Sequence, residues 1–105
     1  MPVQHIESSK ALNDLVRVNP LVVIDFSATW CRPCKEIAPV YDKLSTQFNN
    51  WVFTKVDVDL VQDAAEFYQV SCMPTFVFIQ NGTVVNRVEG ANINAVTHNL
   101  TSYSC

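Results

Sequence analysis

Residues 21–35 read LVVIDFSATWCRPCK, a mostly apolar run that leads directly into two cysteines separated by two other residues. Both alternating faces of residues 21–28 are apolar, which is typical of a central strand covered by helices on each side. Pro33 is compatible with the first turn of a helix, because its fixed backbone angle suits that position. We therefore expect a buried strand that turns into a helix, with Cys31 and Cys34 at the start of that helix.

Short apolar runs alternate with segments of helical period along the rest of the chain. Asn81-Gly82 between two such runs is a strong signal for a two-residue hairpin turn. The alternation predicts an α/β fold with a largely parallel sheet and one antiparallel pair at the hairpin. The expected strands are 3–6, 21–28, 51–57, 75–80 and 83–89. The expected helices run from Ser8 to Asn19, from near Pro33 to Phe48 with Val40 facing inward, over 59–68, and from Ile93 to Tyr103.

The composition excludes several classes of protein. Of the 105 residues, 49% are hydrophobic and only 16% are charged, with a formal net charge of -3. The chain lacks the positive surface that binding to a nucleic-acid backbone requires, and no apolar run approaches the roughly 20 residues of a membrane span. We expect residues 1–105 to form one domain that binds neither nucleic acid nor membrane. Residues 1–20 show no export signal, which predicts a cytoplasmic location.

Four cysteines are the unusual feature of this composition. They are compatible with a disulfide scaffold, a metal site or thiol chemistry. A zinc site needs four ligands, usually from two close pairs, but Cys72 and Cys105 stand alone and the two histidines lie in the first strand and the last helix. A scaffold disulfide is unnecessary for so apolar a core, and a bridge across two residues closes too small a loop to stabilise the chain much. The position of Cys31 and Cys34 at a helix start therefore favours redox chemistry and no metal site.

The two cysteines of this pair suit different roles. Unpaired N–H groups and the positive end of the helix dipole favour an anion at the first turn, so we expect the pKa of the Cys31 thiol to be lowered. Cys34 lies one helical turn further on, close enough to form a bridge and less accessible. The arrangement suits an attacking thiol at Cys31 and a resolving thiol at Cys34.

Asp25 lies in the middle of the apolar strand and is the second indication of chemistry. A buried carboxylate is costly unless it is protonated, paired or functional, and burial raises its pKa. We expect Asp25 to exchange a proton with the thiol of Cys34 as the disulfide opens and closes. The structural alternative is an aspartate at a strand end that points to solvent. Lys55, the lone charge in 51–56, is either its partner or a lysine on an edge strand that extends to water.

Several separated motifs resemble those of the thioredoxin family, in the same order and over essentially the whole chain. They are DFSATWC at 25–31, CK at 34–35, KVDVD at 55–59, CMPTF at 72–76, NG at 81–82 and GA at 90–91. The resemblance implies a thioredoxin fold, with a central mixed β-sheet flanked by helices on both faces, and the function of a general protein disulfide reductase. It implies that Cys31 and Cys34 form the redox-active disulfide, as nucleophile and resolving thiol, and that Asp25 is the family's buried acid.

The resemblance also implies a surface for the substrate and a source of electrons. Pro74 matches the family's cis-proline beside the active site, and the backbone at Met73 is implied to pair with an extended substrate segment. Trp30, Gly90 and Ala91 match the remaining apolar rim, with core packing as the alternative for Trp30. No bound cofactor is implied. The resemblance implies that electrons come from NADPH through a thioredoxin reductase and pass to disulfide-containing client proteins.

The chain departs from the family between the two active-site cysteines, where Gly-Pro is common and Arg32-Pro33 stands here. A cation beside Cys31 favours its thiolate, so we expect Arg32 to make the disulfide somewhat more oxidising. Cys72 and Cys105 are candidate regulatory thiols, through which the monomer forms a disulfide-linked homodimer under oxidising conditions. The alternative for Cys72 is a spectator thiol packed in the interior.

Two other functions are compatible with the same residues. A disulfide isomerase or oxidase uses the same chemistry, but the lack of an export signal disfavours it. An interaction module with the thioredoxin fold binds partners through the same rim without turnover. The presence of both cysteines favours catalysis over binding alone.

Overall fold

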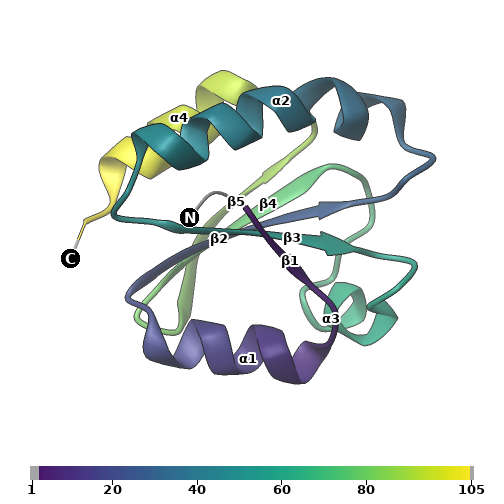
Figure 1. The fold of residues 1–105 in the computed structure, drawn as a ribbon, viewed down its shortest axis with the longest axis horizontal. Coiled ribbons are helices and arrows are strands. Elements are labelled where there is room, and N and C mark those ends of the chain that lie inside the picture. Colours follow the sequence, from purple (N-terminus) through teal and green to yellow (C-terminus); the bar gives the residue numbers. More distant parts are fainter. Residues whose placement is uncertain (1–2, 105) are drawn as a thin grey trace.

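Strands and helices alternate over residues 3–104, the part of the chain that the computed structural model describes (Figure 1). In chain order the elements are β1 (Gln4–Ile6), α1 (Ser9–Val18), β2 (Leu21–Ser27), α2 (Arg32–Gln47), β3 (Val52–Asp57), α3 (Gln62–Phe67), β4 (Thr75–Gln80), β5 (Thr83–Glu89) and α4 (Ile93–Ser102). None of the helices in this part of the chain is long and apolar enough to cross a membrane.

The strands form one mixed sheet in the order β1-β3-β2-β4-β5. β1 and β2 lie parallel to β3 on its two sides, and β4 is antiparallel to both β2 and β5. Every residue of β2 is buried, because this strand has a neighbour on each side and a helical layer on each face. The mixed sheet with β2 at its centre confirms the predicted fold class. The expectation of a largely parallel sheet with a single antiparallel pair was wrong, because β4 is antiparallel to β2 as well as to β5.

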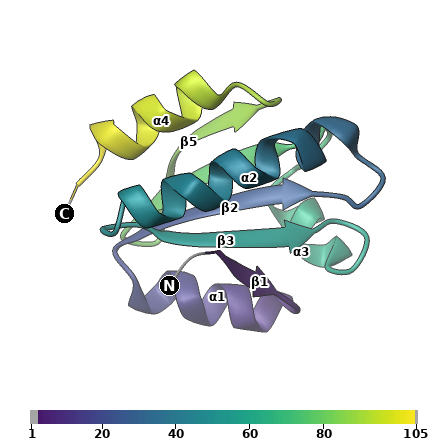
Figure 2. The same ribbon diagram turned by 45° about the horizontal axis from the view of Figure 1, so that its top comes forward.

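Helices cover both faces of the sheet, α2 and α4 on one face and α1 and α3 on the other (Figures 1 and 2). Side chains alternate along a strand, so each strand contributes to both cores. Leu21 of β2 packs in the cluster that contains Ile37 of α2, whereas Val22 packs in the cluster that contains Leu12 of α1. Asp25 has the parity of Leu21 and therefore lies on the face covered by α2.

Side-chain caps start α1 and α2 at the positions that local sequence indicates. The hydroxyl of Ser8 accepts a hydrogen bond from the Ala11 N–H at 3.1 Å, as expected for an N-cap serine. Cys31 is the N-cap of α2, and Pro33 occupies its first turn. α2 then continues through Pro39. The cysteine pair is thus placed by the start of a helix that packs on the central strand.

α3 is shorter than predicted. Instead of 59–68 it spans Gln62–Phe67. The N–H groups of Leu60 and Val61 both donate to the Asp57 carbonyl, at 3.1 and 2.9 Å, so a tight turn replaces the expected first turn of the helix. This turn leaves Leu60 exposed beside the end of β3.

The expectation that Val40 faces the core was also wrong. Its side chain is 41% exposed, whereas Ile37, Tyr41 and Leu44 of the same helix are buried. The buried stripe of α2 is therefore narrower than the apolar pattern in the sequence, and Val40 lies beyond its edge.

Candidate active site

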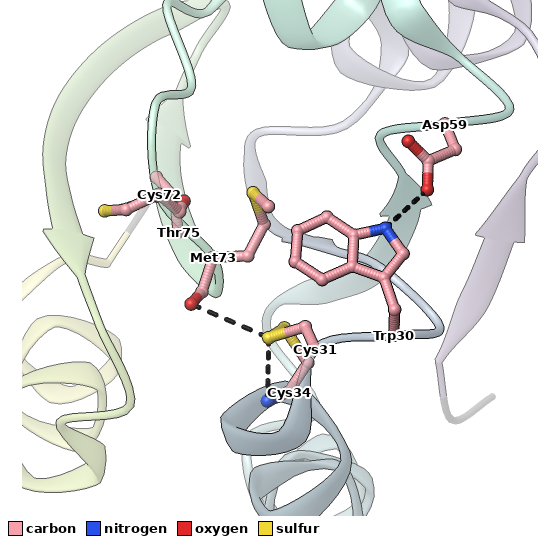
Figure 3. The surroundings of a disulfide bond; sticks show 7 residues. All are labelled: Trp30, Cys31, Cys34, Asp59, Cys72, Met73 and Thr75. Carbon is pink, nitrogen blue, oxygen red and sulfur yellow. Dashed lines mark hydrogen bonds between the residues drawn. A yellow bond between two sulfur atoms is a disulfide. The ribbon is translucent and has the colours of Figure 1, made fainter.

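Cys31 and Cys34 form a disulfide where β2 passes into α2, with their Cα atoms 5.3 Å apart (Figure 3). A turn closed by the Cys31 N–H and the Ala28 carbonyl, 3.2 Å apart, brings the chain from the strand to the helix. At the cap of α2, Cys31 Sγ accepts the N–H of Cys34 at 3.2 Å. The expected redox pair is therefore in place at a helix N-terminus, where a negative charge on Cys31 is favoured.

The environments of the two sulfurs differ more than their burial does. Cys31 is 5% exposed and Cys34 is 2% exposed, so accessible surface alone separates them little. Cys31 Sγ lies 3.7 Å from the carbonyl oxygen of Met73, and the exposed Trp30 lies close to Cys31 on another side (Figure 3). Cys34 instead lines a cavity beneath the start of α2. One cysteine is thus next to a rim that a partner can reach, and the other lies behind it.

The rim around Cys31 comes from three separate parts of the chain, which are Trp30, the Met73-Pro74 segment and the Gly90-Ala91 segment. The Met73-Pro74 peptide bond is cis, as predicted, and the Pro74 carbonyl accepts the N–H of Gly90 at 2.8 Å. Gly90 has a positive φ of 96°, a conformation that favours glycine. The structure thus brings the β5 end, with the exposed Ala91 after it, against the loop before β4.

Trp30 lies on the surface and not in the core. Its side chain is 65% exposed, and its indole Nε1–H donates to Asp59 Oδ2 at 2.8 Å (Figure 3). The alternative of core packing was therefore wrong. The hydrogen bond holds the indole plane at the disulfide while leaving most of the ring available for contact.

Asp25 is fully buried, so the alternative of a solvent-facing aspartate was wrong. In the sheet it lies between Lys55 of β3 and Phe76 of β4. Among the described residues, neither carboxyl oxygen has a hydrogen-bond partner. Burial raises the pKa of Asp25 from 3.8 to about 7, although the charge of Lys55 lowers it and that of Asp42 raises it further. The predicted upward shift is confirmed, and its largest cause is the loss of water.

Lys55 lies next to both Asp25 in the sheet and the cavity that Cys34 lines. β3 is an interior strand with β1 and β2 on its two sides, so the alternative of a lysine on an edge strand was wrong. The Lys55 side chain lines the cavity that Cys34 also lines, of about 500 Å³. The whole lining consists of His5, Ser27, Ala28, Thr29, Cys34, Lys35, Ala38, Lys55 and Asp57. Lys55 thus lies between the buried acid and a space large enough for water.

Arg32 and Cys72 lie outside this core of the site. Arg32 Nε is 3.3 Å from Glu36 Oε2, and the two side chains are 88% and 67% exposed. Cys72 is an exposed free thiol, so the alternative of a packed interior thiol was wrong. Its Sγ is 3.8 Å from Thr75 Oγ1 (Figure 3). Cys105 lies outside the described residues.

Sequence analysis missed two residues that shape the site. Glu36 is four residues after Arg32, a spacing at which helical ion pairs form, so the pair was open to prediction. Asp59 bonds to Trp30 across 29 positions of the chain, and no local pattern indicates that contact. Within residues 3–104 there is no group of three or more His, Cys, Asp or Glu side chains that could hold a metal ion.

The sequence model of the thioredoxin family matches residues 3–102. Mouse thioredoxin is 43% identical, over 97% of this chain and 99% of the mouse protein. The crystal structure of Schistosoma mansoni thioredoxin superposes with a TM-score of 0.93 at 40% identity, covering 98% of this chain and 96% of that one. Peptide-N(4)-(N-acetyl-beta-glucosaminyl)asparagine amidase of Caenorhabditis elegans is 38% identical over 95% of this chain, which spans only 17% of that relative's length. By its family match, its sequence relatives and its fold, the chain belongs to the thioredoxin family.

Proposed function

We propose that this chain is a general protein-disulfide reductase that acts by dithiol–disulfide exchange, with Cys31 as nucleophile and Cys34 as resolving thiol. The observation that carries the proposal is the Cys31–Cys34 disulfide at the first turn of α2, beside the backbone of Met73. The disulfide is the oxidised half of the couple, and its reduction yields two thiols at the same place. Membership of the thioredoxin family and the bonded pair both support protein-disulfide oxidoreductase activity.

Exchange consists of two substitutions at sulfur. The Cys31 thiolate attacks one sulfur of a client disulfide, forming a mixed disulfide and releasing the other client sulfur as a thiolate. The Cys34 thiolate then attacks Cys31 Sγ, forming the Cys31–Cys34 bond and releasing the second client sulfur. The client gains two electrons and two protons, and the protein loses the same. The N–H of Cys34, 3.2 Å from Cys31 Sγ, favours the anionic sulfur in the first step.

Asp25 and Lys55 supply the proton transfer in this scheme. Cys34 loses a proton before it attacks, and a buried acid with a pKa of about 7 is suited to accept one near neutral pH. Lys55 lies opposite Asp25 in the register of β2 and β3, and it lines the same cavity as Cys34. Water in that cavity carries the proton between the thiol, the carboxyl and the solvent.

Clients bind over the rim formed by Trp30, Met73, Pro74, Gly90 and Ala91. An extended client segment pairs with the backbone at Met73, whose carbonyl lies 3.7 Å from Cys31 Sγ. The exposed face of Trp30 covers the segment beside the disulfide. Backbone pairing makes few demands on client sequence, which suits a reductase that acts on many disulfide-containing proteins.

A flavoprotein thioredoxin reductase that draws on NADPH returns electrons to the pair, and the protein itself holds no cofactor. The resemblance to the family supports this partner, together with a role in electron transport and redox homeostasis in the cytoplasm. We further propose that residues 1–105 act as a single monomeric domain. Disulfide-containing proteins and the reductase compete for the same rim, because both exchange electrons with Cys31.

The second candidate function is an interaction module, and the similarity to the Caenorhabditis amidase supports it. That protein is similar to this chain over 17% of its own length, so domains of this kind occur within longer proteins. Reduction of insulin disulfides in dithiothreitol separates the candidates. The assay compares wild-type chain, Cys34→Ser and the matched surface control Cys72→Ser. An interaction module gives equal rates for all three, whereas a reductase loses turnover only in Cys34→Ser.

Arg32 is expected to raise the reduction potential of the pair slightly. Replacement by Gly removes a cation next to Cys31 and should shift the potential to more negative values by about 6 to 20 mV, as for an exposed charge at a helix terminus. The carboxylate of Glu36, 3.3 Å from Arg32 Nε, partly cancels the positive charge near Cys31. Glu36→Gln should therefore shift the potential to more positive values. Redox titration against a glutathione buffer measures both. An unchanged potential, or a shift of Arg32→Gly toward more oxidising values, contradicts this role.

Cys72 and Cys105 are expected to link two copies of the chain under oxidising conditions. The Cys72 thiol is exposed and close to the disulfide rim, so a dimer through it also covers the active site. Non-reducing gels of peroxide-treated protein should show a dimer band for the wild type and none for the double variant Cys72→Ser/Cys105→Ser. A dimer that persists in the double variant rules out these thiols as the link.

A further inference from the structure

Arg87 joins β5 to the end of α3 through two backbone carbonyls. Its position opposite Val77 of β4 places its side chain on the face covered by α1 and α3. Arg87 Nη1 donates to the Tyr68 carbonyl at 2.7 Å, and Nη2 donates to the Gln69 carbonyl at 3.2 Å. Carbonyls at the end of a helix lack partners within the helix, and a cation there also complements the helix dipole.

The backbone that Arg87 holds is in an uncommon conformation. Gln69 has a φ of 56°, in the left-handed region that a non-glycine residue adopts only when its surroundings hold it there. The two guanidinium hydrogen bonds are on this residue and the one before it. Val70, which follows, packs against the core cluster on the α1 face. The exit of the chain from α3 is closed by two backbone hydrogen bonds, from the Gln69 N–H to the Glu66 carbonyl at 3.0 Å and from the Val70 N–H to the Ala65 carbonyl at 2.9 Å. Arg87 adds a contact from β5 to this cap, so it helps to hold the backbone that leads toward residues 70–73.

The segment that leaves α3 leads directly to the rim of the disulfide. Two hydrogen bonds fix the end of this segment that is distant from α3. Thr75 Oγ1 donates to the Cys72 carbonyl at 2.6 Å, and the Gly90 N–H donates to the Pro74 carbonyl at 2.8 Å. Between these two anchors lies Met73, whose carbonyl faces Cys31 Sγ. Arg87 is thus the anchor at one end of a short loop whose other end carries the backbone expected to receive the client.

We propose that Arg87 is a positioning residue for client binding, which holds the loop of residues 69–73 so that the Met73 backbone faces Cys31. The inference rests on the proposed function, in which clients pair with that backbone. A planar guanidinium reaches two adjacent carbonyls at once, which the single ammonium of a lysine does less well. Arg87 also lies on β5, which ends at Glu89, immediately before the rim residue Gly90.

The test separates protein clients from a small disulfide that has no extended backbone. For Arg87→Met, the KM for insulin should rise roughly 3- to 10-fold, the effect of losing one or two hydrogen bonds that orient the site. Its kcat with insulin, its reduction potential and its rate with 5,5′-dithiobis(2-nitrobenzoic acid) should stay within about twofold of the wild type. Arg87→Lys should recover part of the KM, because the charge remains. Amides of residues 70–73 should exchange hydrogen faster in Arg87→Met.

Arg17→Met is the matched control, because Arg17 is an exposed arginine in an ion pair with Asp14 of α1, away from the rim. It should leave every one of these measurements unchanged. An unchanged KM for insulin in Arg87→Met overturns the role of Arg87, and so does an equal loss with the small disulfide, which indicates general damage to the fold. A wild-type chain that fails to reduce insulin overturns the proposed function itself, so the two failures are distinguishable.

Discussion

Turnover of insulin by Cys34→Ser is expected to fall at least about 100-fold below that of the wild-type chain, while a mixed disulfide on Cys31 accumulates. In the native pair the resolving thiol is held with its Cα atom 5.3 Å from that of Cys31. Such a neighbour acts with an effective concentration far above that of millimolar external thiols, up to about 10⁵ M or more when well oriented. Without it, each attack by Cys31 ends in a long-lived adduct.

Mass spectrometry of the trapped species provides the decisive control. The adduct should join the client to Cys31, and it should be absent in Cys31→Ser, because Cys34 is buried and it is Cys31 Sγ that lies next to the Met73 backbone. Cys72→Ser should retain full turnover, since its exposed thiol takes no part in either step. An adduct that forms on Cys34 would reverse the assigned roles. If Cys34→Ser keeps normal turnover, dithiol exchange is not the mechanism.

The position of the redox pair was predictable from sequence because it depends on local features. The apolar run of 21–28 predicts a central strand, Pro33 marks a first helical turn, and the cysteines lie between these two signals. Both features follow from backbone geometry and burial over a few residues. The structure has the same arrangement, with Cys31 as the N-cap of α2.

The details that sequence analysis missed depend on contacts between distant segments. Trp30 was assigned to the rim through the resemblance to the family, but its partner Asp59 follows from how the turn after β3 packs. The same turn shortens α3, which the pattern of apolar residues could not indicate. The link from Arg87 to Tyr68 joins β5 to a helix end, and only the register of the sheet brings them together. Local sequence therefore predicts where the Cys31–Cys34 pair lies in the fold, whereas the residues that surround it depend on tertiary packing.

Asp25 also shows where chemistry and stability oppose each other. A carboxyl that is fully buried and unpaired among the described residues lowers the stability of the folded state whenever it is ionised. No hydrogen bond from the described residues compensates for the burial of this carboxyl. A pKa of about 7 is suited to the proton transfer near neutral pH that we propose for Asp25.

Replacement of Asp25 by Asn is expected to remove a pH-dependent loss of stability. The pKa of Asp25 is about 7 in the folded protein and near 3.8 when unfolded. Between these values the folded state keeps a proton that the unfolded chain has lost, so the free energy of unfolding falls as pH rises through this window and levels off above it. The shift corresponds to about 4 kcal/mol in total, of which somewhat more than half falls between pH 5 and pH 8.

The difference in the free energy of unfolding between Asp25→Asn and the wild type is measured at pH 5 and at pH 8. The change in this difference isolates the titration of the carboxyl, because the other titratable groups are the same in both proteins. The cost of burying the uncharged Asn is the same at both pH values. Urea unfolding of the oxidised forms should therefore show that the free energy of unfolding of Asp25→Asn, relative to the wild type, grows by roughly 2 to 3 kcal/mol from pH 5 to pH 8. Lys55→Met should extend the decline to higher pH in a protein that retains Asp25, because the charge of Lys55 lowers the pKa of Asp25. Parallel pH curves for the wild type and Asp25→Asn would mean that the carboxyl has an ordinary pKa in the folded state and is unsuited to the proposed proton transfer.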